Sequence, residues 1–198
     1  MTGRPARIRV GVLISGQGSN MEALVRRSRE ADCPYDVSLV ISNRPGAAGL
    51  AVAEALGLKV SIIDHADFGM DRKDHERAMD AALRSAGCQA IALAGYMRIL
   101  TPFLVEAWSG RMINIHPSLL PNYPGLETHR RAIEAGDREA GCSVHLVTTG
   151  LDAGPVLGQS RVAILPNDTV ASLAARVLAA EHQLYPQCLA DFVRSIPD

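Results

Sequence analysis

Two polar residues at the end of an apolar run are the leading candidates for chemistry in this chain. Residues 112–116 read Met-Ile-Asn-Ile-His, so Asn114 and His116 lie two positions apart among residues that avoid water. Each polar group costs about 1–3 kcal/mol if it is buried without a hydrogen-bond partner. An amide beside an imidazole can stabilise an oxyanion and relay a proton. The alternative is that both are hydrogen-bonded core residues.

A distant acid could complete this pair. Asp152 lies in the glycine-containing stretch TTGLDAGP (148–155) between two apolar runs, where a side chain can be presented rather than packed. If its carboxylate reaches His116, it favours the charged imidazolium form, which suits oxyanion stabilisation. Taken alone, Asp152 could equally be a turn-forming aspartate.

A glycine loop follows the first apolar run. The stretch SGQGSN (15–20) leads into a helical pattern, and the N-terminus of a helix favours an anion such as phosphate. Gly18 permits a tight turn, while Ser19 and Asn20 can cap the helix. The third glycine of the dinucleotide motif is missing. Two alternatives stay open: a plain strand-to-helix turn, and an NADP-type site in which Arg44 meets the extra phosphate.

These candidates need a framework, and the hydrophobic pattern supplies one. Short apolar runs predict strands, and helical patterns between them predict a parallel sheet covered by helices. The predicted strands are 8–14, 37–41, 59–63, 90–95 and 112–115, and the predicted helices start near Met21 and Thr101 and cover 47–57 and 72–86. Ligands of such sheets bind outside the carboxyl ends of the strands, where the polar pair lies.

The pattern changes after Pro117. An irregular segment (118–128) precedes a short helix over 127–135, and 142–147 and 155–164 read as two further strands. A long final helix is expected from a cap near residues 167–168 to about 194, with a bend at Pro186. We therefore expect an α/β fold in one domain, 1–198, whose mostly parallel sheet has helices on both faces. Within it, we expect residues 1–117 to form a βα half and residues 118–198 to supply further loops, strands and the C-terminal helix.

Composition excludes several classes of protein. The chain has 198 residues, 47% of them hydrophobic, and its 20 Lys and Arg balance 21 Asp and Glu. Because the chain has no net positive charge, we expect neither nucleic acid nor an anionic membrane as a partner. Small molecules are the expected ligands. No run is long enough to span a bilayer. The four cysteines lie far apart, which suits a reducing compartment, so we expect a cytoplasmic protein.

Histidines outside the pair give weaker signals. His65, His75 and His182 lie in polar or helical contexts and are expected to be solvated. A metal site could be drawn on paper from His116, His129, His145 and Asp152, but no close ligand spacing supports it, so no metal is expected. A serine hydrolase is also disfavoured, because no G-x-S-x-G motif is present.

Four fragments carry a family resemblance. The stretches LISGQGSN (13–20), LAGYMRIL (93–100), INIHPSLLPNYPG (113–125) and LDAGPV (151–156), in this order, resemble the folate-dependent phosphoribosylglycinamide formyltransferases of purine synthesis. The resemblance covers nearly the whole chain. It implies a Rossmann-like formyltransferase fold and transfer of the formyl group of 10-formyltetrahydrofolate to the amine of glycinamide ribonucleotide, without a metal or a formyl-enzyme.

The resemblance also implies residue roles. Asn114, His116 and Asp152 match the catalytic trio of the family. The nucleotide's phosphate and ribose are assigned to Gly18, Ser19, Asn20 and Glu181. The folate donor is assigned to Arg72, Met97, Arg98, Ile99, Leu100, Thr148, Thr149, Gly150, Leu151 and Asp152.

The chain departs from the family at some peripheral positions. Leu178, Glu127 and Asn122 stand where relatives often have a polar residue, a histidine and a basic residue. Near rivals are methionyl-tRNA formyltransferase and formyltetrahydrofolate deformylase, each of which needs a further domain for which this chain has no room. A non-catalytic module that binds folate or nucleotide is another alternative. A homodimer stays open.

Overall fold

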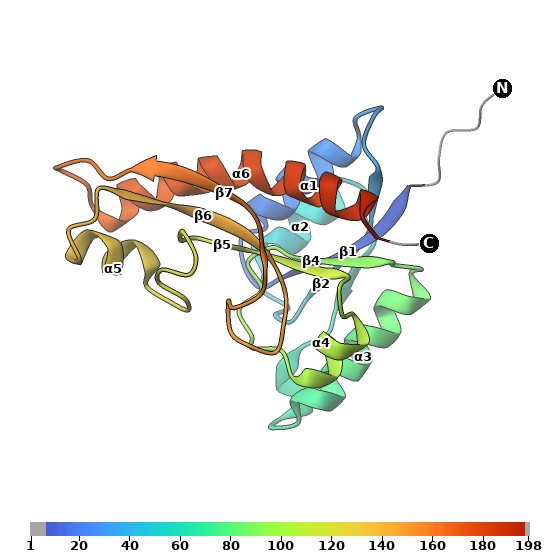
Figure 1. Ribbon diagram of the computed structural model, residues 1–198. Coiled ribbons are helices and arrows are strands. Elements are labelled where there is room, and N and C mark those ends of the chain that lie inside the picture. Colours follow the sequence, from blue (N-terminus) through green and yellow to red (C-terminus); the bar gives the residue numbers. More distant parts are fainter. Residues whose placement is uncertain (1–6, 197–198) are drawn as a thin grey trace.

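A seven-stranded sheet runs through the centre of the computed structural model, which describes residues 7–196 (Figure 1). The strand order is β3-β2-β1-β4-β5-β6-β7. Strands β1 to β5 are parallel, whereas β6 is antiparallel to β5 and β7 is antiparallel to β6. The strands are β1 (Ile8–Ile14), β2 (Tyr35–Ser42), β3 (Val60–Ile62), β4 (Ala90–Leu93), β5 (Met112–His116), β6 (Glu139–Leu146) and β7 (Val156–Ala163).

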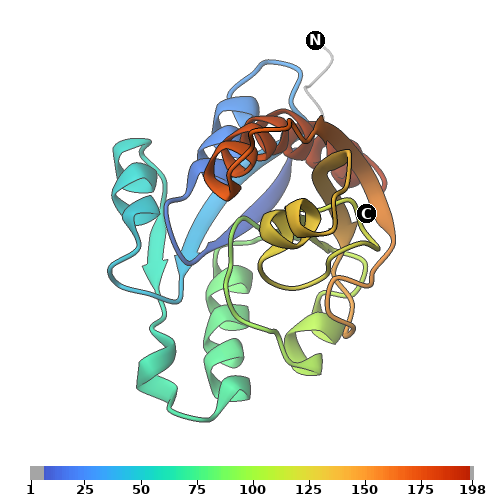
Figure 2. The ribbon, with the colours of Figure 1, turned by 90° about the vertical axis from the view of Figure 1, so that its left-hand side faces the viewer.

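Helices cover both faces of this sheet. Helices α1, α2 and α6 lie on one face and α3 and α4 on the other, while α5 lies beyond the carboxyl end of β5 (Figures 1 and 2). The helices are α1 (Ser19–Ser28), α2 (Ala48–Ala55), α3 (Arg72–Ser85), α4 (Pro102–Ala107), α5 (Thr128–Glu134) and α6 (Val170–Arg194). The expected α/β fold, with a mostly parallel sheet and a long final helix, is confirmed.

The two faces of the sheet enclose two apolar clusters. Val10, Val12 and Ile14 of β1 pack with residues of α1 and α6, whereas Leu13 packs with α3 and α4. This division follows from the two-residue period of a strand. Gly11 lies on the α3 face, where an added Cβ would come within 2.2 Å of Leu83 Cδ2. The strand therefore lacks a side chain where α3 presses against it.

Some local expectations are wrong. Helix α1 begins at Ser19 rather than near Met21, because Gly18 takes the N-cap position with φ 77°, and no side chain caps this end. Helix α6 is capped by Thr169, which forms a capping box with Ser172, instead of by residue 167 or 168. A 3-10 helix, η1 (His65–Phe68), was not expected.

His75 corrects the expectation that this residue is solvated. Its side chain lies inside the α3 face and is only 1% exposed, and its Nε2 lies 2.9 Å from the carbonyl oxygen of Ile63. The ring also meets Phe68 edge-on at 5.3 Å. Burial lowers the pKa of His75, so its neutral form donates to Ile63. Separately, no helix within residues 7–196 has the length and apolar character needed to cross a membrane.

Candidate active site

The candidate catalytic side chains come from two neighbouring antiparallel strands. In the register of β5 and β6, Asn114 is opposite His145 and His116 is opposite Ser143. Directly opposed residues point to the same side of a sheet. Four polar side chains therefore share one face of the sheet near the carboxyl end of β5. Ligands of α/β folds bind outside the carboxyl ends of the strands.

The three predicted catalytic residues lie together. His116 Nδ1 is 3.5 Å from Asp152 Oδ2, and the other oxygen of that carboxylate is 3.6 Å from His145 Nε2. Asn114 Nδ2 is 3.1 Å from the same nitrogen of His145. The side chains of His116, His145 and Asp152 are 7%, 4% and 9% exposed. Asp152 thus lies between two buried imidazoles, one of which accepts a hydrogen bond from the amide of Asn114.

The sequence did not single out His145 for a role in catalysis. Its Nδ1 lies 2.9 Å from the carbonyl oxygen of Leu146, an acceptor, so we assign the proton to Nδ1. Burial is the main cause of the lowered pKa of His145, which keeps the ring neutral, although the nearby Asp152 opposes this shift. The neutral Nε2 then accepts from the amide of Asn114. A signal for this role was present, because Ser143 and His145 repeat the alternation of Asn114 and His116.

A strap, defined as residues 117–127, covers the histidine and the acid. The carbonyl oxygen of Tyr123 is 3.0 Å from His116 Nε2, and the amide of Gly125 donates to Asp152 Oδ2 at 2.8 Å. The phenol of Tyr123 donates to Asp137 at 2.6 Å. Tyr123 has φ 54° and Asp152 φ 48°, a left-handed conformation that is rare outside glycine. Both ring nitrogens of His116 consequently face oxygen atoms of the protein.

The glycine loop turns tightly between β1 and α1. Gly18 has φ 77°, and a Cβ there would lie 2.7 Å from the Cα of Gly49. The amide of Gly49 donates to the carbonyl oxygen of Gly16 at 2.9 Å, which fixes the loop against the start of α2. The first amides of α1 have no partner within the helix, so the loop presents donors suited to an anion.

Asn20 and Glu181 are brought together from α1 and α6. Asn20 Nδ2 donates to Glu181 Oε2 at 2.7 Å, and the residues are 8% and 6% exposed. Burial raises the pKa of the Glu181 carboxyl, and the hydrogen bond from Asn20 partly offsets this. Asn20 Oδ1 is buried and, within the described part of the chain, has no hydrogen-bond partner. A ligand hydroxyl could satisfy this acceptor.

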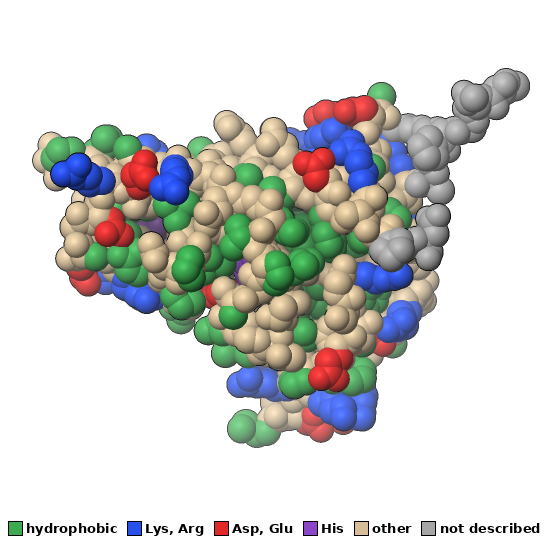
Figure 3. Space-filling view, viewed as in Figure 1, with side chains coloured by type: hydrophobic (Ala, Val, Ile, Leu, Met, Phe, Trp, Pro, Cys, Tyr) green, Lys and Arg blue, Asp and Glu red, His purple; other side chains and the backbone are tan. Residues whose placement is uncertain are grey.

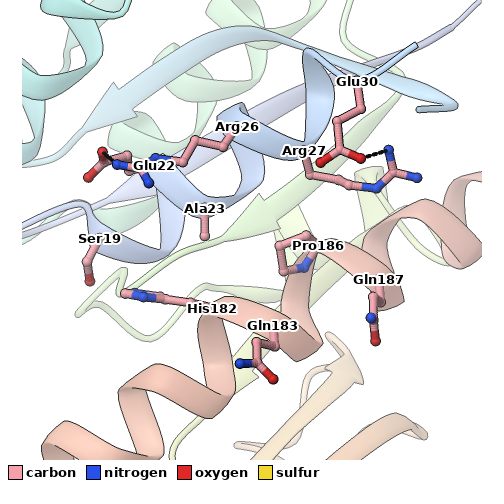
Figure 4. A pocket seen from close by; sticks show the side chains of 10 residues that line it. All are labelled: Ser19, Glu22, Ala23, Arg26, Arg27, Glu30, His182, Gln183, Pro186 and Gln187. Atoms are coloured by element: carbon pink, nitrogen blue, oxygen red, sulfur yellow. Dashed lines mark hydrogen bonds and ion pairs between the residues drawn. The ribbon is translucent and has the colours of Figure 1, made fainter. Parts of the chain in front are cut away.

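A groove of about 590 Å³ runs between α1 and α6 (Figure 4). Ser19 and His182 line one end of it, and Arg27 and Gln187 line the other. Ser19 is the only predicted site residue in its lining, and none of the catalytic side chains contributes to it. The groove is therefore continuous with the glycine loop but separate from the catalytic cluster.

The residues assigned to the folate donor are mostly exposed. Met97, Ile99 and Leu151 are 63%, 61% and 57% exposed, and large apolar side chains left in water often mark a binding surface. Apolar side chains also gather in the middle of the face seen in Figure 3, with charged residues toward its rim. Leu100 and Val147 pack against the same apolar cluster, which links segment 97–100 to the strand that leads into 148–152.

Arg72 stands apart from this group. It is the exposed first residue of α3, and within residues 7–196 no hydrogen bond or ion pair joins its side chain to the other predicted donor residues.

The histidines considered as metal ligands include His129, which lies near His116. The pKa of His129 is lowered, mainly by burial and to a smaller extent by the charge of His116. In the part of the chain that the structure describes, no three His, Cys, Asp or Glu side chains are grouped to hold a metal ion.

Comparison with known proteins identifies the family. The model of the formyl transferase family matches residues 8–189. The chain is a member of the formyl transferase family. Within it, the phosphoribosylglycinamide formyltransferase of Escherichia coli is 41% identical over 181 residues, which cover 91% of this chain and 85% of that protein. The crystal structure of the enzyme of the same name from Brucella melitensis superposes with a TM-score of 0.91 at 47% identity, covering 98% of this chain and 99% of that one.

Some relatives in this family are much longer. The trifunctional purine biosynthetic protein adenosine-3 of Drosophila melanogaster is 46% identical over 189 residues, which cover 94% of this chain but only 14% of that protein. The chain therefore spans about a seventh of that relative. The formyltransferase fold expected from the sequence fragments is confirmed.

Proposed function

We propose that this chain transfers the formyl group of 10-formyltetrahydrofolate to the amine of glycinamide ribonucleotide. The observation that carries the proposal is the buried cluster in which Asp152 lies between His116 and His145 beside Asn114. Relatives named phosphoribosylglycinamide formyltransferase match this chain over most of their own length, which supports the same activity. In the reaction, the amine nitrogen bonds to the formyl carbon, the bond from that carbon to the folate nitrogen breaks, and a proton passes from the amine to that nitrogen.

Asn114 and His116 are proposed to stabilise the tetrahedral intermediate. One N–H of the Asn114 amide is used by His145, which leaves the second N–H to donate to the developing oxyanion. His116 is the second donor, with Asp152 behind its Nδ1. Loss of one such donor typically costs about 100- to 1,000-fold in rate. Asp152 is also the group proposed to assist the proton transfer.

The strap is proposed to shift when substrates bind. In the structure, the carbonyl oxygen of Tyr123 lies 3.0 Å from His116 Nε2, the nitrogen that is proposed to donate to the formyl oxygen. The strap must therefore release this nitrogen before His116 can donate to the substrate. Leu126 in the strap is 77% exposed, so its side chain does not hold the strap in the core.

The substrate sites are proposed on either side of this cluster. Gly18, Ser19 and Asn20 would hold the nucleotide's phosphate, with Glu181 and the unpartnered oxygen of Asn20 facing the ribose. Segments 97–100 and 148–152 would border the pterin ring of the donor, because they expose apolar side chains beside the catalytic residues. The cysteines of the described chain are free, which supports the cytoplasmic location that we also propose.

The test follows the deformylated folate by its absorbance, with and without glycinamide ribonucleotide. The proposal predicts that folate is released only when the nucleotide is present. Release without the nucleotide would instead indicate a deformylase. Binding of both ligands without turnover would indicate a non-catalytic module.

A further inference from the structure

Ser15 joins two parts of the site that lie on different strands. It follows β1 directly, at the start of the glycine loop, and is 4% exposed. Its amide donates to the carbonyl oxygen of Gly95 at 3.1 Å, and its hydroxyl oxygen accepts from the amide of Met97 at 2.8 Å. One residue of the glycine loop therefore makes two bonds to the turn that follows β4.

The orientation of this hydroxyl is fixed from the other side. Ser15 Oγ donates to Asn43 Oδ1 at 2.6 Å, and Asn43 is only 1% exposed after the end of β2. The backbone carbonyl of Asn43 in turn accepts from Nδ1 of His65 at 2.7 Å. Because the single hydroxyl proton is used by Asn43, the lone pairs of Ser15 Oγ are left for the amide of Met97.

The bond to Met97 concerns the side of the site assigned to the folate donor. Met97 and Ile99 turn their side chains outward, 63% and 61% exposed, so neither side chain anchors segment 97–100 in the core. The Ser15 hydroxyl restrains the start of the segment through the amide of Met97, and Leu100 packs against an apolar cluster at the other end. The phosphate side has a separate restraint, because the amide of Gly49 holds the carbonyl of Gly16 and does not involve the hydroxyl.

We propose that Ser15 is a positioning residue that sets segment 97–100, and with it the folate-donor subsite, against the glycine loop. This inference rests on the proposed function, because that function assigns the donor to segment 97–100. Removal of the hydroxyl should therefore weaken binding of the folate donor and leave binding of the nucleotide unchanged. An effect on stability alone would weaken both or neither.

The test compares Ser15→Ala with Ser28→Ala. Ser28 is an equally buried serine, 7% exposed, whose hydroxyl donates to the carbonyl of Val25 within α1, far from segment 97–100 in the chain. In Ser15→Ala, the amide of Met97 loses its partner, and we expect the KM for 10-formyltetrahydrofolate to rise roughly 5- to 30-fold. The KM for the nucleotide should change by less than about twofold, and Ser28→Ala should change neither constant by more than that.

Two further measurements keep the inference independent of turnover. Amide hydrogen exchange at Met97 should become at least about tenfold faster in Ser15→Ala than in the wild type, since its acceptor is gone. Calorimetric binding of tetrahydrofolate should weaken by the same factor as the KM. Ser15→Cys keeps a weak acceptor of similar size, so its exchange rate and its affinity for tetrahydrofolate should lie between those of the wild type and Ser15→Ala. This variant replaces Ser15→Ala if the alanine variant does not fold.

The outcomes separate the two proposals. If the wild type does not transfer the formyl group, the proposed function fails, whereas the exchange rate of the Met97 amide still reports on Ser15. Unchanged protection of the Met97 amide in the variants would overturn the role of Ser15. An equal rise of both KM values, or of neither, would overturn it as well.

Discussion

The two halves of the candidate site are built in different ways. At the glycine loop, backbone amides and close approaches between glycines form the site, as in the contact of Gly18 with Gly49. At the catalytic cluster, side chains from an antiparallel strand pair and a loop form it, with Asp152 between His116 and His145. The glycine loop therefore depends on backbone geometry, and the catalytic cluster depends on particular functional groups. Substitutions should separate the two.

The largest effect is expected at the carboxylate of the catalytic cluster. Asp152→Asn keeps an acceptor for the amide of Gly125 but removes the negative charge between the two imidazoles. We expect kcat to fall roughly 1,000-fold, because proton transfer and oxyanion stabilisation both suffer. Calorimetry should find nucleotide binding unchanged.

Asp168→Asn is the matched control for this change. Asp168 is also a buried carboxylate, with a side chain that is 4% exposed, and it binds Arg176 in the second turn of α6. This partner lowers the pKa of the Asp168 carboxyl, so the group is structural and charged. The variant should lower Tm and leave kcat within about twofold. If the two variants lose activity equally, the distinction between the regions fails.

A smaller effect is expected at the residue that holds Asn114. His145→Leu removes the acceptor at Nε2 and frees the amide, so we expect kcat to fall roughly 10- to 100-fold through misplacement of the donor. His145→Gln, which keeps an acceptor, should recover most of this loss. Steady-state kinetics with both substrates measure the difference, and a glutamine variant as poor as the leucine variant would argue against the positioning role.

At the glycine loop, the expected effect is on binding. Gly18→Ala forces a Cβ into a left-handed conformation and within 2.7 Å of the Gly49 backbone, at a cost of about 1–3 kcal/mol. The KM for the nucleotide should rise about tenfold, and the KM for the folate donor should stay near its original value. Gly46→Ala is the control, because within residues 7–196 no atom beyond its two chain neighbours lies within 4 Å of its added Cβ. A rise of both KM values in Gly18→Ala would remove the contrast with the catalytic cluster.

The same division explains what the sequence could predict. The alternation of apolar runs with helical patterns predicted each strand of the sheet. The position of Asn114 and His116 at the carboxyl end of β5 followed from the sequence of that run alone. The role of His145 depends on the pairing of β5 with β6, 31 residues away along the chain, which local patterns do not specify. The strap owes its shape to left-handed residues other than glycine, such as Tyr123, that no turn rule anticipates.

Histidine burial gives the smallest of the expected effects. Burial lowers the pKa of four histidines, and for each of them the unfolded chain binds a proton near pH 6.5 more readily than the folded protein does. Their contribution to stability is therefore fully present above about pH 6.5 and is lost as the pH falls below it. These histidines are His75, His129, His145 and His182.

Urea denaturation checks this pH dependence. The midpoint should fall between pH 7.5 and pH 5.5 in the wild type. It should fall less in His75→Gln, which keeps a donor for the carbonyl of Ile63 but does not titrate. A wild-type midpoint that is constant, or that rises on acidification, would contradict the neutral state assigned to these rings.

The most direct test of the account follows the formyl carbon itself. With a donor labelled with ¹³C at the formyl group, NMR spectra recorded during turnover show where the carbon goes. The arrangement of Asn114, His116 and Asp152 predicts that all of the label appears in the amide of the nucleotide product and that none moves when the nucleotide is absent. Label released as formate, or label that stays on the folate with both substrates present, would contradict the account.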